Sequence, residues 1–315
     1  MRGIVQLGTT AVPFFLLLGG MLACVSQGYA WIAVLLSIPV GGLLVRLFII
    51  QHDCGHGSFF ASRTANEWVG RLISLLTLAP YDFWRRSHAL HHATSGNLSR
   101  RGIGDVTTLT VQEYLALTPW QRIGYRIYRH PLFLFGFGVP FYFLVYQRSP
   151  LFHPLKVKDI WKSIIGLDAA MVAVYGGLMW LIGVKPVLAV IVPIVFVASS
   201  IGGWLFFVQH QFEETHWEYA GDWDYQVAAV HGSSYYVLPP ILQWFTGNIG
   251  LHHIHHLCST IPNYRLQECL DASPELQTMN RLTLLESLNC VRLALWDEAN
   301  RKLVSFREAR GLVPA

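Results

Sequence analysis

The chain has 315 residues, of which 53% are hydrophobic and only 13% are charged, and its formal net charge is +4. An ordinary soluble domain carries about 25% charged residues, so this composition excludes a disordered chain, a coiled coil and a nucleic-acid-binding domain. It is typical of a protein whose solvent is a lipid bilayer. The 5 cysteines are odd in number and have no C-x-x-C spacing, which disfavours a disulfide framework or a zinc knuckle.

Four apolar runs are long enough to cross the roughly 30 Å hydrocarbon core of a bilayer, which takes about 20 residues of helix. Short connectors join the first run to the second and the third to the fourth, so we expect two transmembrane hairpins. A cleaved signal peptide over residues 2–24 is the alternative for the first run, but another long apolar run follows it at once. The predicted transmembrane helices are residues 9–28, 29–50, 164–183 and 187–208.

Two further apolar runs, 69–80 and 131–146, are too short for a comfortable crossing, and we expect them to be interfacial or re-entrant. Of the 23 Lys and Arg, 13 lie between residues 51 and 163 and 7 between 265 and 310, whereas the two connectors hold only Lys185. The positive-inside rule then places both termini and the polar mass in the cytoplasm. We therefore predict an all-α membrane protein, a single domain over residues 1–315, whose four transmembrane helices carry a helical cytoplasmic cap.

Histidines gather in three short boxes at or near the ends of these runs. In a helix, residues at i, i+3 and i+4 share one face, so the spacing within each box turns its imidazoles the same way. His253, beside the first residue of the last box, is turned about 100° away and is left out of the predicted site. The boxes hold eight histidines at facing positions: His52 and His56, then His88, His91 and His92, then His252, His255 and His256.

Clustered neutral imidazoles indicate a transition-metal site, because imidazole suits iron, copper, zinc and nickel. Eight histidines are too many for one zinc ion, which takes about four ligands. Bis-histidine haem needs facing pairs at mid-membrane depth, whereas these boxes lie outside the apolar runs. A ferritin-like carboxylate site needs two Glu-x-x-His motifs, and the chain has one, Glu213 to His216. A histidine-rich site for two iron ions remains.

The residues that flank the boxes carry a family resemblance. From about residue 30 to 270 the chain resembles the integral-membrane fatty acid desaturases, most closely their bacterial and cyanobacterial acyl-lipid branch. Related histidine-box hydroxylases and alkane monooxygenases share the box spacing but not these flanking sequences. The matching segments are His52–Phe60, His88–Asn97, Gln209–Thr215, Gly232–Tyr236 and Gln243–Asn248.

This resemblance implies a di-iron centre that uses O₂ and two electrons to remove two hydrogens from neighbouring methylenes of an acyl chain. It also implies a ninth histidine ligand near the end of the fourth transmembrane helix. His210 stands at that place, and His231 is a weaker candidate. We expect the remaining histidines to be interfacial or structural: His130, His153 and His216.

The motifs also suggest residues around the metal ligands and the substrate. Metal-bound histidines usually donate their other N–H to a carboxylate or a carbonyl. The candidates for that role are Asp53, Asp105, Glu213, Glu214, Asp222, Asp224 and Asn248. Aromatic residues close to the boxes could line an acyl tunnel or form an interfacial belt. The tunnel candidates are Trp84, Tyr235, Tyr236, Trp244 and Phe245.

The resemblance favours membrane glycerolipid acyl chains as substrate and a bacterial inner membrane as location. The chain has no Gly-rich dinucleotide fingerprint and no flavin motif, so we expect electrons from a separate protein: ferredoxin, flavodoxin or a cytochrome b5-like carrier. Basic residues such as Arg85, Arg86, Arg100 and Arg101 would suit an acidic carrier or lipid phosphates, although topology explains them equally well. Two alternatives stay open: a lipid or carotenoid hydroxylase or ketolase on the same scaffold, and a non-enzymatic metal- or haem-binding membrane protein.

Overall fold

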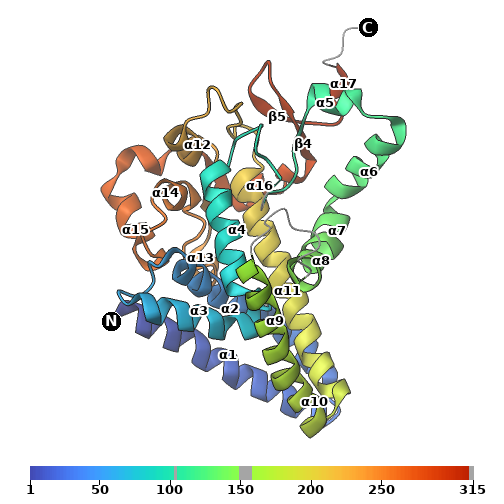
Figure 1. Ribbon diagram of the computed structural model, residues 1–315, viewed down its shortest axis with the longest axis vertical. Coiled ribbons are helices and arrows are strands. Elements are labelled where there is room, and N and C mark those ends of the chain that lie inside the picture. Colours follow the sequence, from blue (N-terminus) through green and yellow to red (C-terminus); the bar gives the residue numbers. More distant parts are fainter. Residues whose placement is uncertain (103–104, 149–157, 312–315) are drawn as a thin grey trace.

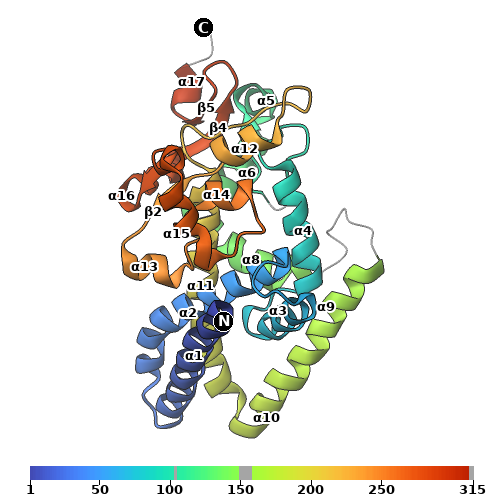
Figure 2. The ribbon, with the colours of Figure 1, turned by 90° about the vertical axis from the view of Figure 1, so that its left-hand side faces the viewer.

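Four long apolar helices dominate the computed structural model, which describes residues 1–102, 105–148 and 158–311 (Figures 1 and 2). Each has an apolar stretch long enough to cross a membrane, as the four predicted runs do. The third is built from three consecutive segments, α9 (Lys158–Met171), η4 (Val172–Gly176) and α10 (Gly177–Ile182). The other three are α1 (Arg2–Ser26), α2 (Ala30–His56) and α11 (Val184–His210).

The helices extend beyond the predicted apolar runs at the ends that matter for the site. The second run was expected to end at residue 50, yet α2 continues through His52 and ends at His56, where Gly57 adopts a left-handed conformation with φ of 70°. Likewise α11 continues to His210. Hydropathy marks only the apolar part of a helix, whereas the backbone hydrogen bonds continue into polar residues. These extensions hold their histidines on rigid helix.

Neither of the two short apolar runs is among the candidate membrane spans in the described part of the chain. Most of the run 69–80 lies in α3 (Arg63–Thr77), an amphipathic helix. The run 131–146 forms three short consecutive elements and the start of a fourth. These are α7 (Pro131–Phe133), η1 (Leu134–Gly138), α8 (Val139–Leu144) and η2 (Tyr146–Arg148).

The long helices pack unequally. α1 packs along α2, and α2 packs against α11. The α2–α11 contact is close because α2 carries Gly41 there: a Cβ at Gly41 would lie 2.6 Å from Cγ1 of Val197. Small residues at such crossings let helix backbones approach each other within a membrane. The α9–α10 helix instead diverges from α11 above the turn at Gly183 (Figure 2).

The remaining elements form a cap at one end of the long helices (Figure 1). Among them, α4 and α14 carry the second and third histidine boxes. The helices of the cap are α4 (Tyr81–Thr94), α5 (Val111–Ala116), α6 (Pro119–Arg129), α12 (Tyr225–His231), α13 (Pro240–Phe245), α14 (His252–Leu257), α15 (Asn263–Ala272), η5 (Pro274–Gln277), α16 (Leu284–Ser287), η6 (Cys290–Arg292) and α17 (Glu308–Gly311).

The prediction of an all-α chain is wrong in one respect, because the cap contains two small β-sheets. In the first, β4 (Leu293–Asp297) pairs antiparallel with β5 (Lys302–Ser305) and parallel with β1 (Leu109–Thr110). In the second, β2 (Tyr235–Val237) pairs parallel with β3 (Arg281–Thr283). Strands of two to five residues are too short for a clear alternating pattern, and β1 and β4 are far apart in sequence. Only the tertiary fold brings them together.

We predict that Gly41→Leu destabilises the protein, because the added side chain would overlap Val197 in the α2–α11 contact. Overpacking of this kind typically costs about 1–3 kcal/mol. The matched control is Gly20→Leu in α1, where a Cβ would meet nothing within 4 Å. Thermal unfolding of the detergent-solubilised variants should show a lower midpoint for Gly41→Leu than for Gly20→Leu. Equal midpoints would contradict this account of the crossing.

Candidate metal centre

Nine histidines from four helices converge in the cap, at the ends of α2 and α11. They form two groups, and within each group one ring nitrogen per residue lies within 4.8 Å of all the others. All nine are residues that the sequence suggested as ligands. The first group contains His52, His56, His88, His92 and His255. The second contains His91, His210, His252 and His256.

Each box of three histidines contributes to both groups, a division that the spacing alone does not reveal. On α4, His88 and His92 face the first group, whereas His91 faces the second. Adjacent residues in a helix point about 100° apart, so His91 and His92 diverge although they are neighbours in sequence. On α14 the division is reversed, since His255 joins the first group. The two helices therefore hold the two groups side by side.

The distances between the ring nitrogens fit bound metal better than hydrogen bonding. In the first group, the Nε2 atoms of His52 and His88 are 2.9 Å apart, those of His88 and His92 are 3.0 Å apart, and those of His92 and His255 are 3.1 Å apart. A neutral ring nitrogen carries either one hydrogen or one lone pair, so it can make only one such bond. His88 and His92 each face two partners through a single nitrogen, and three hydrogen bonds cannot all form.

The second group shows the same geometry. Nε2 of His210 lies 3.2 Å from that of His91 and 3.1 Å from that of His252. Two imidazole nitrogens that bind one ion at about 2.1 Å and at right angles would lie roughly 3.0 Å apart. Nε2 of His56 and of His256 are buried and have no hydrogen-bond partner in the described part of the chain. These residues fit a metal ion in each group.

Burial keeps the imidazoles in the form that binds metal. It lowers the pKa of His88, His92 and His255 well below the usual range, and repulsion from neighbouring imidazoles lowers each pKa further. The pKa of His252 and of His256 is lowered in the same way. A metal ion needs the neutral imidazole with its lone pair free. The site is therefore ready for a cation without first losing protons.

Two buried carboxylates and a carbonyl orient three of the histidines. Nδ1 of His52 donates to Asp53 Oδ1 at 3.0 Å, and Nδ1 of His91 donates to Asp105 Oδ1 at 2.6 Å. Nδ1 of His210 donates to the carbonyl oxygen of Gly232 at 3.1 Å. Each contact leaves Nε2 free to face its group. Asp53 and Asp105 therefore lie where the sequence analysis suggested.

Sequence reasoning missed Asn263, which holds Asp53 in turn. Asp53 Oδ2 accepts from the backbone N–H of Asn263 at 2.6 Å and from its Nδ2 at 2.8 Å. Asn263 stands outside the motifs that carry the resemblance, and a backbone carbonyl such as that of Gly232 leaves no mark on the sequence. Neither contact had a signal that could have been read in advance.

The other acidic and amide candidates lie away from the histidine rings. Glu213 pairs with Lys302 at 2.8 Å, and Asp224 accepts from the N–H of Val227 at 2.9 Å as the N-cap of α12. Asn248 donates to the carbonyl of Asn263 at 3.0 Å. Glu214 and Asp222 are exposed.

The remaining histidines that the structure describes also lie outside both groups. His253 donates through Nε2 to the carbonyl of Leu276 at 3.0 Å, and burial lowers its pKa to about 4. His231 and His130 are exposed and His216 is half-buried. His153 lies outside the described residues.

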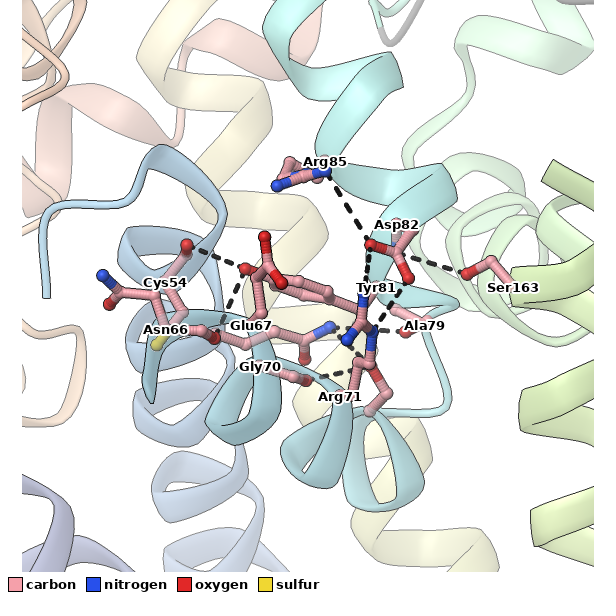
Figure 3. A network of polar contacts seen from close by, with 12 residues as sticks. Cys54, Asn66, Glu67, Gly70, Arg71, Ala79, Tyr81, Asp82, Arg85 and Ser163 are labelled. Atoms are coloured by element: carbon pink, nitrogen blue, oxygen red, sulfur yellow. Dashed lines mark hydrogen bonds and ion pairs between the residues drawn. The ribbon is translucent and has the colours of Figure 1, made fainter. Parts of the chain in front are cut away.

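A polar network fixes the start of α4 against its neighbours (Figure 3). The hydroxyl of Tyr81 donates to the carbonyl of Cys54 at 2.8 Å, which ties α4 to the end of α2 between His52 and His56. Asp82 pairs with Arg71 of α3 at 3.1 Å, and its N–H donates to Ser163 of α9 at 3.2 Å. Gly70 makes room for the Tyr81 ring, because a Cβ there would lie 2.2 Å from it.

A largely apolar cavity of about 640 Å³ reaches the histidines from the long helices. His52, His88, His91 and His252 form part of its wall, together with side chains of α2, α11, η1 and α8. Trp84, one of the tunnel candidates, lines the cavity and stacks on His88 with ring centroids 4.6 Å apart.

The other four tunnel candidates do not line this cavity. Tyr235 and Tyr236 line a separate pocket of about 20 Å³. Trp244 covers the guanidinium of Arg46 at 4.2 Å, and Phe245 packs against Gly42 of α2. Closeness to a histidine box in the sequence did not predict which residues line the cavity, because side chains of other segments, such as η1 and α8, form much of its wall.

Comparisons with known proteins agree with this site. A family model described as fatty acid desaturase matches residues 29–286. The chain is similar to a fatty acid desaturase of Bacillus subtilis, with 41% identity over 307 residues, 97% of this chain and 86% of that protein.

More distant relatives include a Synechocystis protein named sn-1 acyl-lipid omega-3 desaturase (ferredoxin). It is 31% identical over 251 residues, which is 74% of this chain and 64% of that protein. A Helianthus annuus protein named sn-2 acyl-lipid omega-3 desaturase (ferredoxin), chloroplastic, is 29% identical over 254 residues, 74% of this chain and 53% of that protein. The family match covers most of the chain, and the Bacillus protein matches nearly all of it. The chain therefore belongs to the fatty acid desaturase family.

Proposed function

We propose that this protein is an O₂-dependent acyl-lipid desaturase with two iron ions, one in each histidine group. The observation that carries the proposal is that histidines of both groups line one apolar cavity. The overall reaction would convert –CH₂–CH₂– to –CH=CH–, with O₂, two electrons and two protons giving two molecules of water. The acyl chain supplies the other two electrons that O₂ needs.

The protein's own residues would hold and orient the ions. His52, His56, His88, His92 and His255 would hold one ion, and His91, His210, His252 and His256 the other. When bound, the iron ions would supply the oxidising power to break an unactivated C–H bond. Asp53 and Asp105 would keep His52 and His91 in the tautomer that presents Nε2.

The cavity has the size and lining for an acyl chain. Ligand pockets commonly enclose about 300–1,000 Å³, and this one falls within that range. Phe137 and Phe141 line the cavity and are also 55% and 40% exposed, so they mark its opening on the side of η1 and α8. An acyl chain entering there would meet Trp84 and the histidines. Small placement errors at this point would reduce the rate and the regioselectivity.

The distribution of basic residues supports a membrane arrangement with the polar mass in the cytoplasm. The proposed arrangement is a single desaturase domain over residues 1–315, with two hairpins in a bacterial inner membrane and with the termini and histidines in the cytoplasm. A cytoplasmic site would give soluble electron carriers direct access. The Synechocystis relative is named as a ferredoxin enzyme, which supports ferredoxin as the carrier over flavodoxin or a cytochrome b5-like protein.

Expression in a host with simple lipids, followed by fatty-acid profiling and metal analysis, tests the function. The native protein should produce new double bonds and contain two irons per chain. His252→Ala should lose iron and product, because a ligand of the second group is removed. His253→Ala is the matched control: it should retain both, since its ring faces Leu276 instead. New hydroxyl groups instead of double bonds would favour the hydroxylase alternative and contradict the proposal.

We predict that Gly202→Leu alters which chains are desaturated. Gly202 lines the cavity, and a Cβ there would meet nothing within 4 Å, so the leucine side chain would occupy cavity space without a backbone clash. Longer acyl chains should lose activity more than shorter ones, or the double bond should move along the chain. Product profiles by mass spectrometry would show this. Gly20→Leu, away from the cavity, should leave the profile unchanged.

Purified protein with NADPH alone should be inactive, and ferredoxin with its reductase should restore turnover. The reason is that the chain has neither a dinucleotide fingerprint nor a flavin motif. The rescue should weaken as salt rises, because electrostatic steering is screened over about 10 Å at 0.1 M. Turnover with NADPH and no added protein would rule the claim out, and a rescue insensitive to salt would rule out its electrostatic part.

A further inference from the structure

Helix α6 presents an apolar face outward. Trp120, Ile123 and Ile127 lie at i, i+3 and i+7 and are 81%, 47% and 52% exposed. Such spacing places them on one side of the helix. In a helix at the surface of a soluble protein this stripe would face the core.

The polar groups of α6 are used inside the protein. Buried Arg129 donates through Nη2 to Gln211 Oε1 at 2.7 Å and to the carbonyl of Leu293 at 2.8 Å. The hydroxyl of Tyr125 donates to the carbonyl of Ala294 at 2.8 Å. These contacts tie the inner face of α6 to β4 and to the residue after α11. They fix the helix in an orientation that leaves the apolar stripe uncovered.

The neighbouring arginines of α6 behave in the same way. Arg122 donates through Nε to the carbonyl of Leu117 at 3.0 Å, and Arg126 donates through Nε to the hydroxyl of Tyr114 at 2.6 Å. In the part of the chain that the structure describes, the hydrogen-bond partners of Arg122, Arg126 and Arg129 are neutral, and none of the three forms an ion pair. Residues 114–147 contain three arginines and no Asp or Glu, whereas the next arginine, Arg148, pairs with Asp168.

The exposed apolar surface continues from α6 toward the cavity opening. Leu132 in α7 is 80% exposed, and Phe137 and Phe141 follow it. α6 and α8 succeed each other along one side of the molecule, and α6 slopes across the direction of α1 and α11 (Figure 1). A helix that runs across the transmembrane bundle and is joined to the run 131–146, which we expect to be interfacial, is placed to lie along a membrane surface.

We propose that α6 lies in the plane of the bilayer surface, with its stripe of Trp120, Ile123 and Ile127 inserted at the boundary between headgroups and acyl chains. Tryptophan favours this layer, and a basic segment without acidic residues favours an anionic leaflet. Bound in this way, α6 holds the cavity opening at Phe137 and Phe141 level with the lipids. The proposal goes beyond the desaturase function, since it needs only that the chain spans a bilayer.

Fluorescence quenching in vesicles of phosphatidylcholine and phosphatidylglycerol tests this placement independently of activity. Subtracting the emission of Trp120→Phe from that of the native protein isolates the Trp120 component. A second variant, Trp120→Phe with Tyr219→Trp, is the matched control, because Tyr219 is 44% exposed on the cap near the β4–β5 turn. One quencher is lipid brominated near the headgroup, and the other is acrylamide in the water.

The Trp120 component should lose most of its emission to brominated lipid and little to acrylamide, whereas a tryptophan at position 219 should show the reverse. Trp120 quenched by acrylamide as strongly as the control would overturn the proposal. Protection of Trp120 from both quenchers would also overturn it, because a second protein copy would then cover the stripe. Omitting phosphatidylglycerol should reduce the bromolipid effect, and an unchanged effect would overturn the anionic preference.

Discussion

The rest of the structure depends on holding nine imidazoles so that one ring nitrogen of each converges on its group in a largely buried interior. Burying a polar nitrogen without a partner costs free energy, and Nε2 of His56 and of His256 have no hydrogen-bond partner among the described residues. Rigid helices and hydrogen bonds hold these histidines in place. Two of the four helices that carry these histidines are the long helices α2 and α11, and outer contacts such as Asp105 to His91 set the ring orientation. A bound cation would offset the remaining cost.

Two adjacent glycines of α11 have opposite surroundings: one lies at a tight helix contact, and the other faces open space. On α11, a Cβ at Gly203 would lie 2.6 Å from Val139 of α8, whereas a Cβ at the adjacent Gly202 would meet nothing within 4 Å. Gly203 lets α8 pack against α11, and Gly202 leaves room in the cavity. The cavity therefore follows from where small side chains allow contact and where they face an opening. Histidines line it because α2, which forms part of its wall, also carries His52, and because α4 and α14 bring His88, His91 and His252 to the same wall.

The cap is organised around the same constraint. α4 supplies histidines to both groups, and its first turn is fixed to α2, α3 and α9 by Tyr81 and Asp82. Asn263, at the start of α15, reaches back to Asp53 at the end of α2. The sheet of β1, β4 and β5 lies farther out (Figure 1), where β4 anchors the inner face of α6 through Ala294. The outer elements of the cap thus hold the elements that carry the histidines in place.

The sequence by itself determined the four apolar helices and the three boxes with their eight histidines, because these depend on local patterns, whereas His210 was expected from the family resemblance. A long apolar run is read from composition, and spacing of three or four residues fixes a helix face. It also placed Asp53 next to His52. Only the tertiary structure decided which histidines share a group, that Asn263 holds Asp53, and that Trp84 lines the cavity while Tyr235 and Trp244 do not. Those outcomes depend on how distant helices cross, and no local pattern encodes a crossing.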